Sequence, residues 1–114
     1  MPRPKKIETR IAEKQASLEE LFCDLDQNRR TTVTPLIERA AFIIIHLQDL
    51  ELQLNAEGWT EEYQNGQSQS GIKRSAAADV HIALTKNLTA ITKQLLELVP
   101  AAKRQSKLED MRSK

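Results

Sequence analysis

Residues 58–75 read GWTEEYQNGQSQSGIKRS, and they include all three glycines of the chain, its only Trp and its only Tyr. On each side lies a long segment with helical apolar spacing. Glycine and the Asn65-Gly66 pair mark a change of chain direction, because Gly adopts a positive φ at little cost. We therefore expect an all-α fold, in which residues 34–57 and 76–99 form the arms of a long antiparallel helical hairpin and residues 58–75 form its bend.

The composition indicates a single small domain. The chain has 114 residues, and only 4% of them are aromatic, so its core has to be built from aliphatic side chains. The lone Cys23 excludes an internal disulfide and suits a reducing compartment. No secretory signal opens the sequence, and no apolar run approaches the roughly 18–20 residues of a membrane span. We expect a cytoplasmic protein without a membrane partner.

The net charge of +1 hides an uneven distribution along the chain. Residues 1–33 carry seven basic and six acidic side chains, residues 34–99 carry five and eight, and residues 100–114 carry five and two. The sequence therefore predicts a basic N-terminal helix with its connection, an acidic hairpin that forms the oligomerisation core, and a basic flexible tail. Basic ends on a helical body are able to meet phosphate groups, although short basic termini are also common as solvated tails.

The first segment, residues 7–25, carries one apolar stripe and is predicted to be an amphipathic helix. Residues 27–34 are expected to be a connection. The basic side chains of both parts are candidates for contacts with a DNA backbone, whose affinity depends steeply on salt. These candidates are Arg3, Lys5, Lys6, Arg10, Lys14, Arg29 and Arg30.

Thr34-Pro35 is a helix start signal, with Thr34 as the cap and Pro35 at the first helical position. Both arms then show the 3.5-residue seam of a coiled coil. The seam residues, which we predict to form the core of the hairpin and of its oligomer, are Leu36, Ile43, Leu47, Leu50, Leu54, Leu84, Leu88, Ile91, Leu95 and Leu98. The first arm has a second apolar stripe that one partner helix cannot cover, so it needs at least two neighbours. This surplus predicts self-association.

Local signals mark the ends of the arms. Gly58 is placed to end the first arm in a left-handed cap, with Trp59 folded back on the last turn. Ser75 is placed to cap the second arm, and Pro100 should stop it. The remaining residues, 101–114, have little apolar surface to bury, and we expect a frayed or partner-dependent tail.

The sequence gives little support for catalysis. The glycines match no phosphate-binding loop, and Cys23, His46 and His81 lie on three different elements without the spacing of zinc ligands. The neighbouring acids Glu61 and Glu62 are interpreted as a solvated charge pair. We expect no enzyme activity, no metal and no cofactor. No RNA-binding aromatic stripe and no helix-turn-helix pattern is visible either.

The bend resembles the signature of one group of phage terminase small subunits. The matching residues are Glu62-Tyr63-Gln64-Asn65-Gly66 and Gln69-Ser70-Gly71-Ile72-Lys73, followed by a helix. In that family a long helix enters a "YQNG…QSG.K" bend and a second helix leaves it. The resemblance covers about residues 34–100. Where family members often have Pro after the Lys, this chain has Arg74-Ser75, and the helix-turn-helix of many small terminases is not evident.

The resemblance implies a non-enzymatic packaging protein in the cytoplasm of a host cell. It would bind double-stranded viral DNA, assemble with itself as a ring, and recruit or regulate the large ATPase and nuclease subunit. Lys73 and Arg74 at the bend are candidates for a partner or phosphate contact, and their alternative is a solvated turn. Two other functions remain open: a coiled-coil adaptor or scaffold that never touches nucleic acid, and a small dimeric DNA-binding regulator.

Overall fold

The structure is a computed structural model that describes residues 3–64, 66 and 69–113. Its elements follow the chain in this order: α1 (Ile7–Leu21), α2 (Gln27–Glu57), β1 (Thr60–Gln64), β2 (Ser70–Arg74), α3 (Ala76–Glu97), a short 3-10 helix η1 (Ala101–Lys103), and α4 (Arg104–Ser113). The molecule is elongated and flat, with extents of 63 × 40 × 21 Å.

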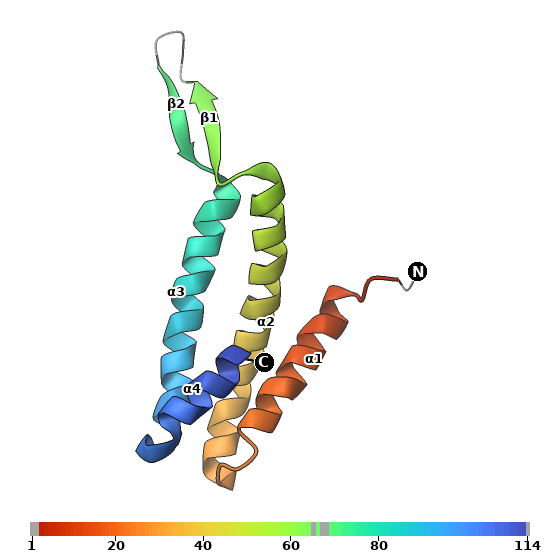
Figure 1. The fold of residues 1–114 in the computed structure, drawn as a ribbon, viewed down its shortest axis with the longest axis vertical. Coiled ribbons are helices and arrows are strands. Elements are labelled where there is room, and N and C mark those ends of the chain that lie inside the picture. Colours follow the sequence, from red (N-terminus) through yellow and green to blue (C-terminus); the bar gives the residue numbers. More distant parts are fainter. Residues whose placement is uncertain (1–2, 65, 67–68, 114) are drawn as a thin grey trace.

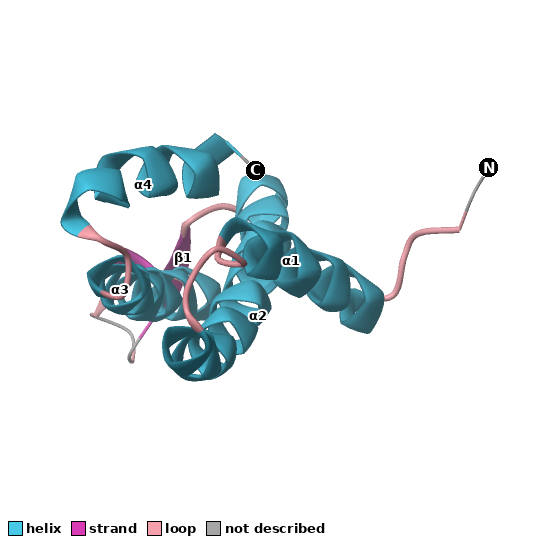
Figure 2. Ribbon diagram, turned by 90° about the horizontal axis from the view of Figure 1, so that it is seen from below, coloured by secondary structure: helices cyan, strands magenta, loops and turns pink. Residues whose placement is uncertain are grey.

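The arrangement of the helices centres on α2, which contacts α1 on one flank and α3 on the other. Figure 1 shows α2 and α3 side by side in opposite directions, with the two strands projecting beyond their shared end. Seen along the long axis, α4 lies across the opposite end and bridges α3 and α1 (Figure 2). The prediction that the first arm needs two neighbours is confirmed, and one of them is α1 of the same chain.

The predicted all-α fold with a long antiparallel helical hairpin is wrong. The predicted bend contains a two-stranded antiparallel sheet, in which Glu61 lies opposite Lys73 and Tyr63 lies opposite Gly71. The helices on either side are also unequal, with 31 residues in α2 and 22 in α3. The physical reason is that aromatic and β-branched residues around an Asn-Gly pair favour a β-hairpin over a simple bend. Gly66 has the positive φ of such a turn, at 79°, whereas Asn65 lies outside the described residues.

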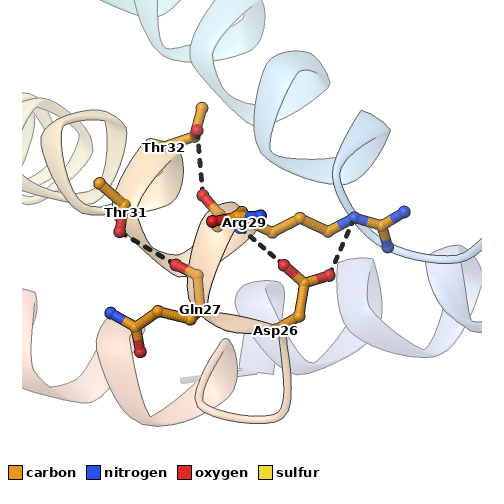
Figure 3. A network of polar contacts seen from close by, with 6 residues as sticks. Asp26, Gln27, Arg29, Thr31 and Thr32 are labelled. Atoms are coloured by element: carbon orange, nitrogen blue, oxygen red, sulfur yellow. Dashed lines mark hydrogen bonds and ion pairs between the residues drawn. The ribbon is translucent and has the colours of Figure 1, made fainter.

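The start of α2 also differs from the prediction. The helix begins at Gln27, so the expected connection is helical and Pro35 lies inside the helix. Asp26 is the cap: its Oδ1 accepts the backbone N–H of Arg29 at 2.9 Å, and its Oδ2 faces the Arg29 guanidinium at 3.5 Å (Figure 3). An Asp one residue before a helix is as strong a cap as Thr, and it takes precedence here because it comes first.

The first two turns of α2 are rich in Thr, a residue that competes with helical backbone bonds. Each of Thr31, Thr32 and Thr34 donates its hydroxyl to the carbonyl four residues earlier (two of these bonds are drawn in Figure 3). This bonding keeps a Thr compatible with a helix. Pro35 lacks an N–H, so the backbone bond that would end at the Thr31 carbonyl is absent. Thr34 is therefore an interior residue and not the cap.

The main core lies at the end of the molecule away from the strands. It gathers side chains from α1 and the turn after it, from the first half of α2, and from the end of α3. Its buried members are Leu18, Leu21, Phe22, Leu25, Val33, Ile37, Ala40, Ala41, Leu95 and Val99. Of the predicted seam, Ile43, Leu47, Leu54 and Leu95 are buried, and the other six residues are partly buried.

The segment predicted to be a frayed tail forms η1 and α4. Met111 packs against the main core, and Lys107 donates to the Leu21 carbonyl at the end of α1. Arg104 donates its Nε–H to the carbonyls of Leu96 and Val99 at 3.1 and 3.0 Å. Long cationic side chains thus donate hydrogen bonds to free carbonyls at the C-terminal ends of α1 and α3. Their positive charge also interacts favourably with the negative end of each helix dipole.

Candidate nucleic-acid interface

The predicted basic residues divide into two groups at opposite ends of α1. Lys5, Arg10 and Lys14 lie around one open groove of about 510 Å³ between α1 and α2. The other side chains lining this groove are Glu13, Ser17, Ile45 and Gln48. Arg3 and Lys6 are exposed just before α1. The structure therefore brings Lys5, Arg10 and Lys14 of the predicted set together around one surface. We call this groove, with Lys5, Arg10 and Lys14 around it, the basic groove.

Arg10 sets the geometry of the basic groove, because it ties α1 to α2. Its Nη1 lies 2.8 Å from Oδ1 of Asp49, and its Nη2 lies 3.2 Å from Oε1 of Gln48. The Arg10 side chain is 29% exposed, so this pair is partly shielded from water. Arg10 thus positions the wall of the groove, and its charge is already compensated by Asp49.

Lys5 and Lys6 are more available. Lys5 reaches both carboxylate oxygens of Glu13 at 2.9 Å, but the two side chains are 60% and 54% exposed. Exposed pairs of this kind are worth only about 0–1 kcal/mol, so a phosphate oxygen competes with Glu13 at little cost. Within the described part of the chain, neither Arg3 nor Lys6 makes an ion pair.

Arg29 and Arg30 do not join the basic groove. Both lie in the first turn of α2, next to the C-terminal end of α1, and α1 is about 22 Å long at 1.5 Å per residue. Arg29 is held by Asp26, as described above. Arg30 is exposed beside a separate hollow of about 220 Å³ under Val33 and Ile37. Any contact these two arginines make is separate from the groove.

The basic residues of the predicted bend are paired with acids. Nζ of Lys73 lies 3.5 Å from Glu61 on the opposite strand, and Nε of Arg74 lies 3.3 Å from Asp79 in the first turn of α3. Ser75 caps that helix as predicted, accepting the N–H of Ala78 at 3.1 Å. Lys73 and Arg74 therefore belong to the framework of the strands, with their side chains still exposed to partners.

The base of the β-hairpin is fixed by residues whose roles differ from those expected. Gly58 ends α2 with a positive φ of 93°, but its ψ of 158° is extended, so the cap is not the left-handed one predicted. The aromatic partner of Trp59 lies on α3. The Trp59 ring meets His81 of α3 edge-on at 5.2 Å, and the His81 Nε2 lies 3.2 Å from Glu51 of α2. The edge-on aromatic contact thus joins Trp59, next to β1, to α3, and the His81–Glu51 contact joins α3 to α2.

Among the described residues, no group of three or more His, Cys, Asp or Glu side chains is arranged to hold a metal ion. His46 packs against the Phe42 ring at 4.2 Å, and Cys23 is exposed and free. No helix in the described part of the chain is long and apolar enough to cross a membrane.

Sequence reasoning missed the α2 side of the basic groove. Gln48 and Asp49 stand in a run of alternating polar and apolar residues, and nothing in that run marks them as partners of α1. The comparisons do not supply a relative from which to assign them: no protein-family model, no curated protein and no solved structure matches the chain.

Proposed function

We propose that this chain is a small terminase subunit, a non-enzymatic protein that binds viral DNA, associates with copies of itself as a ring, and recruits or regulates the large ATPase and nuclease subunit. The observation that carries the DNA-binding part is the basic groove, where Arg10 and Lys14 of α1 and Lys5 just before it lie around one open surface. The packaging role itself rests on the resemblance of the bend described above.

The groove favours contact with the nucleic-acid backbone over reading of bases. Its cations are long side chains around an open surface, which suits contacts with phosphate groups rather than with base edges. Binding of this kind is insensitive to sequence and steeply dependent on salt. Specificity for a packaging site would then come from the assembly and from the large subunit.

The rival function is an adaptor that binds only protein. It is favoured by one observation: Lys5 and Arg10 are both paired with acids of the same chain. Such pairs are typical of a solvated surface that binds no nucleic acid. The two functions differ in what happens to DNA binding when Lys5 at the groove and the adjacent Lys6 lose their charge.

The test compares two double variants in a titration of duplex DNA by fluorescence anisotropy at several salt concentrations. Lys5→Gln/Lys6→Gln removes the charge of Lys5 at the groove and that of its neighbour in sequence, Lys6. It leaves Arg10 in place, because Arg10 also holds α1 on α2. Lys86→Gln/Lys93→Gln removes two exposed charges from α3, on the other flank of α2. We expect the first variant to bind about tenfold more weakly, with a salt slope lower by about 0.9 per lost contact, and the second to match the wild type.

Two results would contradict the proposal. One is a wild-type chain without DNA affinity at low salt, and the other is an equal loss in both variants. Either would leave the adaptor as the better description.

A further inference from the structure

The β-hairpin presents two unpaired strand edges to solvent. In the described chain β1 and β2 pair only with each other, so the outer edge of each strand has free N–H and C=O groups. The hairpin projects beyond the ends of α2 and α3 (Figure 1), and its strand residues are exposed apart from the partly covered Gly71. A two-stranded sheet on its own is marginally stable in water, and a free edge readily pairs with another strand.

The two edges carry opposite charge. The β1 sequence TEEYQ has two acids, Glu61 and Glu62, and no base. The β2 sequence SGIKR has two bases, Lys73 and Arg74, and no acid. Within the hairpin this places Glu61 directly opposite Lys73, with their charged atoms 3.5 Å apart. Lys73 and Arg74 are paired with Glu61 and Asp79 of the same chain, but these side chains stay largely exposed, so a neighbouring copy can compete for them.

We propose that β1 of one chain pairs with β2 of the next copy of this chain, antiparallel as in the hairpin itself. The charges select this pairing: two β1 edges would bring Glu61 and Glu62 against like charges, and two β2 edges would do the same with Lys73 and Arg74. Opposite charges across neighbouring strands stabilise, and directly opposed like charges destabilise. The partner that fits the surface is therefore a second copy.

This contact is head-to-tail, since it joins two different edges. Contacts of this type close into a ring when the rotation between copies allows it. All hairpins then point the same way, with the helices of every copy on the same side. Closure also covers one face of the sheet. Ile72 and Tyr63 are 71% and 39% exposed in the single chain and lie on opposite faces, so closure covers one of the two.

The inference deepens the self-association in the proposed function, but it does not depend on DNA contact. A single contact between strands of five residues is weak. Closure makes the last contact intramolecular and stabilises the whole ring. Charges at a strand edge can also have the opposite role, which is to prevent pairing with another chain. Pairing predicts that the full-length protein is a multimer, whereas prevention of pairing predicts that it is a monomer.

The experiment uses two full-length variants and their mixture, with mass measured by native mass spectrometry and by light scattering after size exclusion. Glu61→Lys/Glu62→Lys makes both strands basic, and Lys73→Glu/Arg74→Glu makes both acidic. We expect the wild type to be a multimer and each variant alone to have the mass of one chain. The equimolar mixture should form multimers again, with equal numbers of the two chains in alternation. Within each variant hairpin the two strands keep the same sign of charge after mixing. Assembly of the mixture therefore has to come from opposite charges that meet between chains. Helical circular dichroism shows that each variant folds.

The matched control is Lys86→Glu/Lys93→Glu, which reverses two exposed charges on α3 and should keep the wild-type mass. Three results would overturn the proposal: a monomeric wild type, variants that keep the wild-type mass, or a mixture that stays dissociated. A monomeric wild type would mean that the charges at the strand edges prevent pairing. DNA binding is read separately. The charge-reversed chains keep the basic groove, so a loss of assembly and a failure of the groove to bind DNA are distinguishable.

Discussion

The ring of Tyr63 lies against Gly71, its directly opposed partner in the β-hairpin, and a Cβ added at Gly71 would come within 3.0 Å of the Tyr63 Cε1 and Oη atoms. Gly71 does not have a positive φ, so space and not backbone conformation is what favours glycine there. An aromatic ring across a glycine shields a strand position that has no side chain of its own.

The first prediction concerns this contact. Gly71→Ala should displace the Tyr63 ring, and because the ring is partly exposed it can move, so the free energy of unfolding should change by only about 0.5 kcal/mol. The Gly71 Hα resonances, shifted upfield by the ring in the wild type, should return to ordinary values in Tyr63→Leu. Unshifted Hα resonances in the wild type would show that the ring lies elsewhere.

The second prediction tests where α2 begins. Asp26→Ala removes the side chain that accepts the Arg29 N–H, and should lower the free energy of unfolding by about 1 kcal/mol, the usual cost of losing a cap. Thr34→Ala is the matched control, since Thr34 lies inside the helix and should cost much less. Urea denaturation measures both. If Thr34→Ala were the more costly change, the start signal at Thr34-Pro35 would be the true one.

The third prediction concerns the attachment of α4 to α1 and its pH dependence. Partial desolvation acts to raise the pKa of the Asp24 carboxyl, but the Lys107 ammonium, the Asp24 backbone amide and Lys103 outweigh it and hold this pKa below its usual value. A lowered pKa in the folded state means that the contribution of Asp24 to stability is present above the unfolded pKa of about 3.9 and is lost as the pH falls through the folded value.

We therefore expect the docking of α4 to be insensitive to pH near neutrality and to weaken only in acid. Lys107→Met should raise the pKa of Asp24, as measured by a carbon NMR titration of its carboxyl group. The same change should speed amide hydrogen exchange in α4 because it removes the bond to the Leu21 carbonyl. A pKa that does not move would mean that Lys107 does not lie beside Asp24 in solution.

The fourth prediction contrasts two leucines. Leu95 is completely buried where α3 meets the main core, and Leu95→Ala should cost about 2–5 kcal/mol of stability. Leu52 is 70% exposed on α2, and Leu52→Ala should cost less than about 0.5 kcal/mol in the single chain. Thermal unfolding distinguishes them. A large loss for Leu52→Ala that depends on protein concentration would place this residue in a contact between copies.

Much of the helical framework was predictable because its signals are local. The Ser75 cap, the end of α3 before Pro100 and the first amphipathic helix follow from rules that involve neighbours in sequence. That helix was predicted over residues 7–25 and ends four residues earlier, at Leu21. The strands were missed because five-residue segments around glycines carry too little periodicity to be separated from a bend. The start of α2 was misplaced because two cap signals compete and only the first is used.

The candidate site was predictable only on one side. The spacing of Arg10 and Lys14 places them on the same face of α1, and the composition marks that face as basic. The contact of Arg10 with Asp49 depends on how α1 crosses α2, which no local pattern specifies. The same holds for Lys107, whose partner carbonyl at Leu21 lies 86 residues away in sequence.

The continuity of α2 has a mechanical consequence. One uninterrupted rod of 31 residues, about 46 Å long at 1.5 Å per residue, joins the main core to the base of the strands. A tilt of about 10° at the core end would move the far end by roughly 8 Å over that length. A small change in how α1 and α4 pack at the core end of the molecule thus becomes a larger displacement of the β-hairpin. The positions of the two ends of the molecule are coupled through the length of α2.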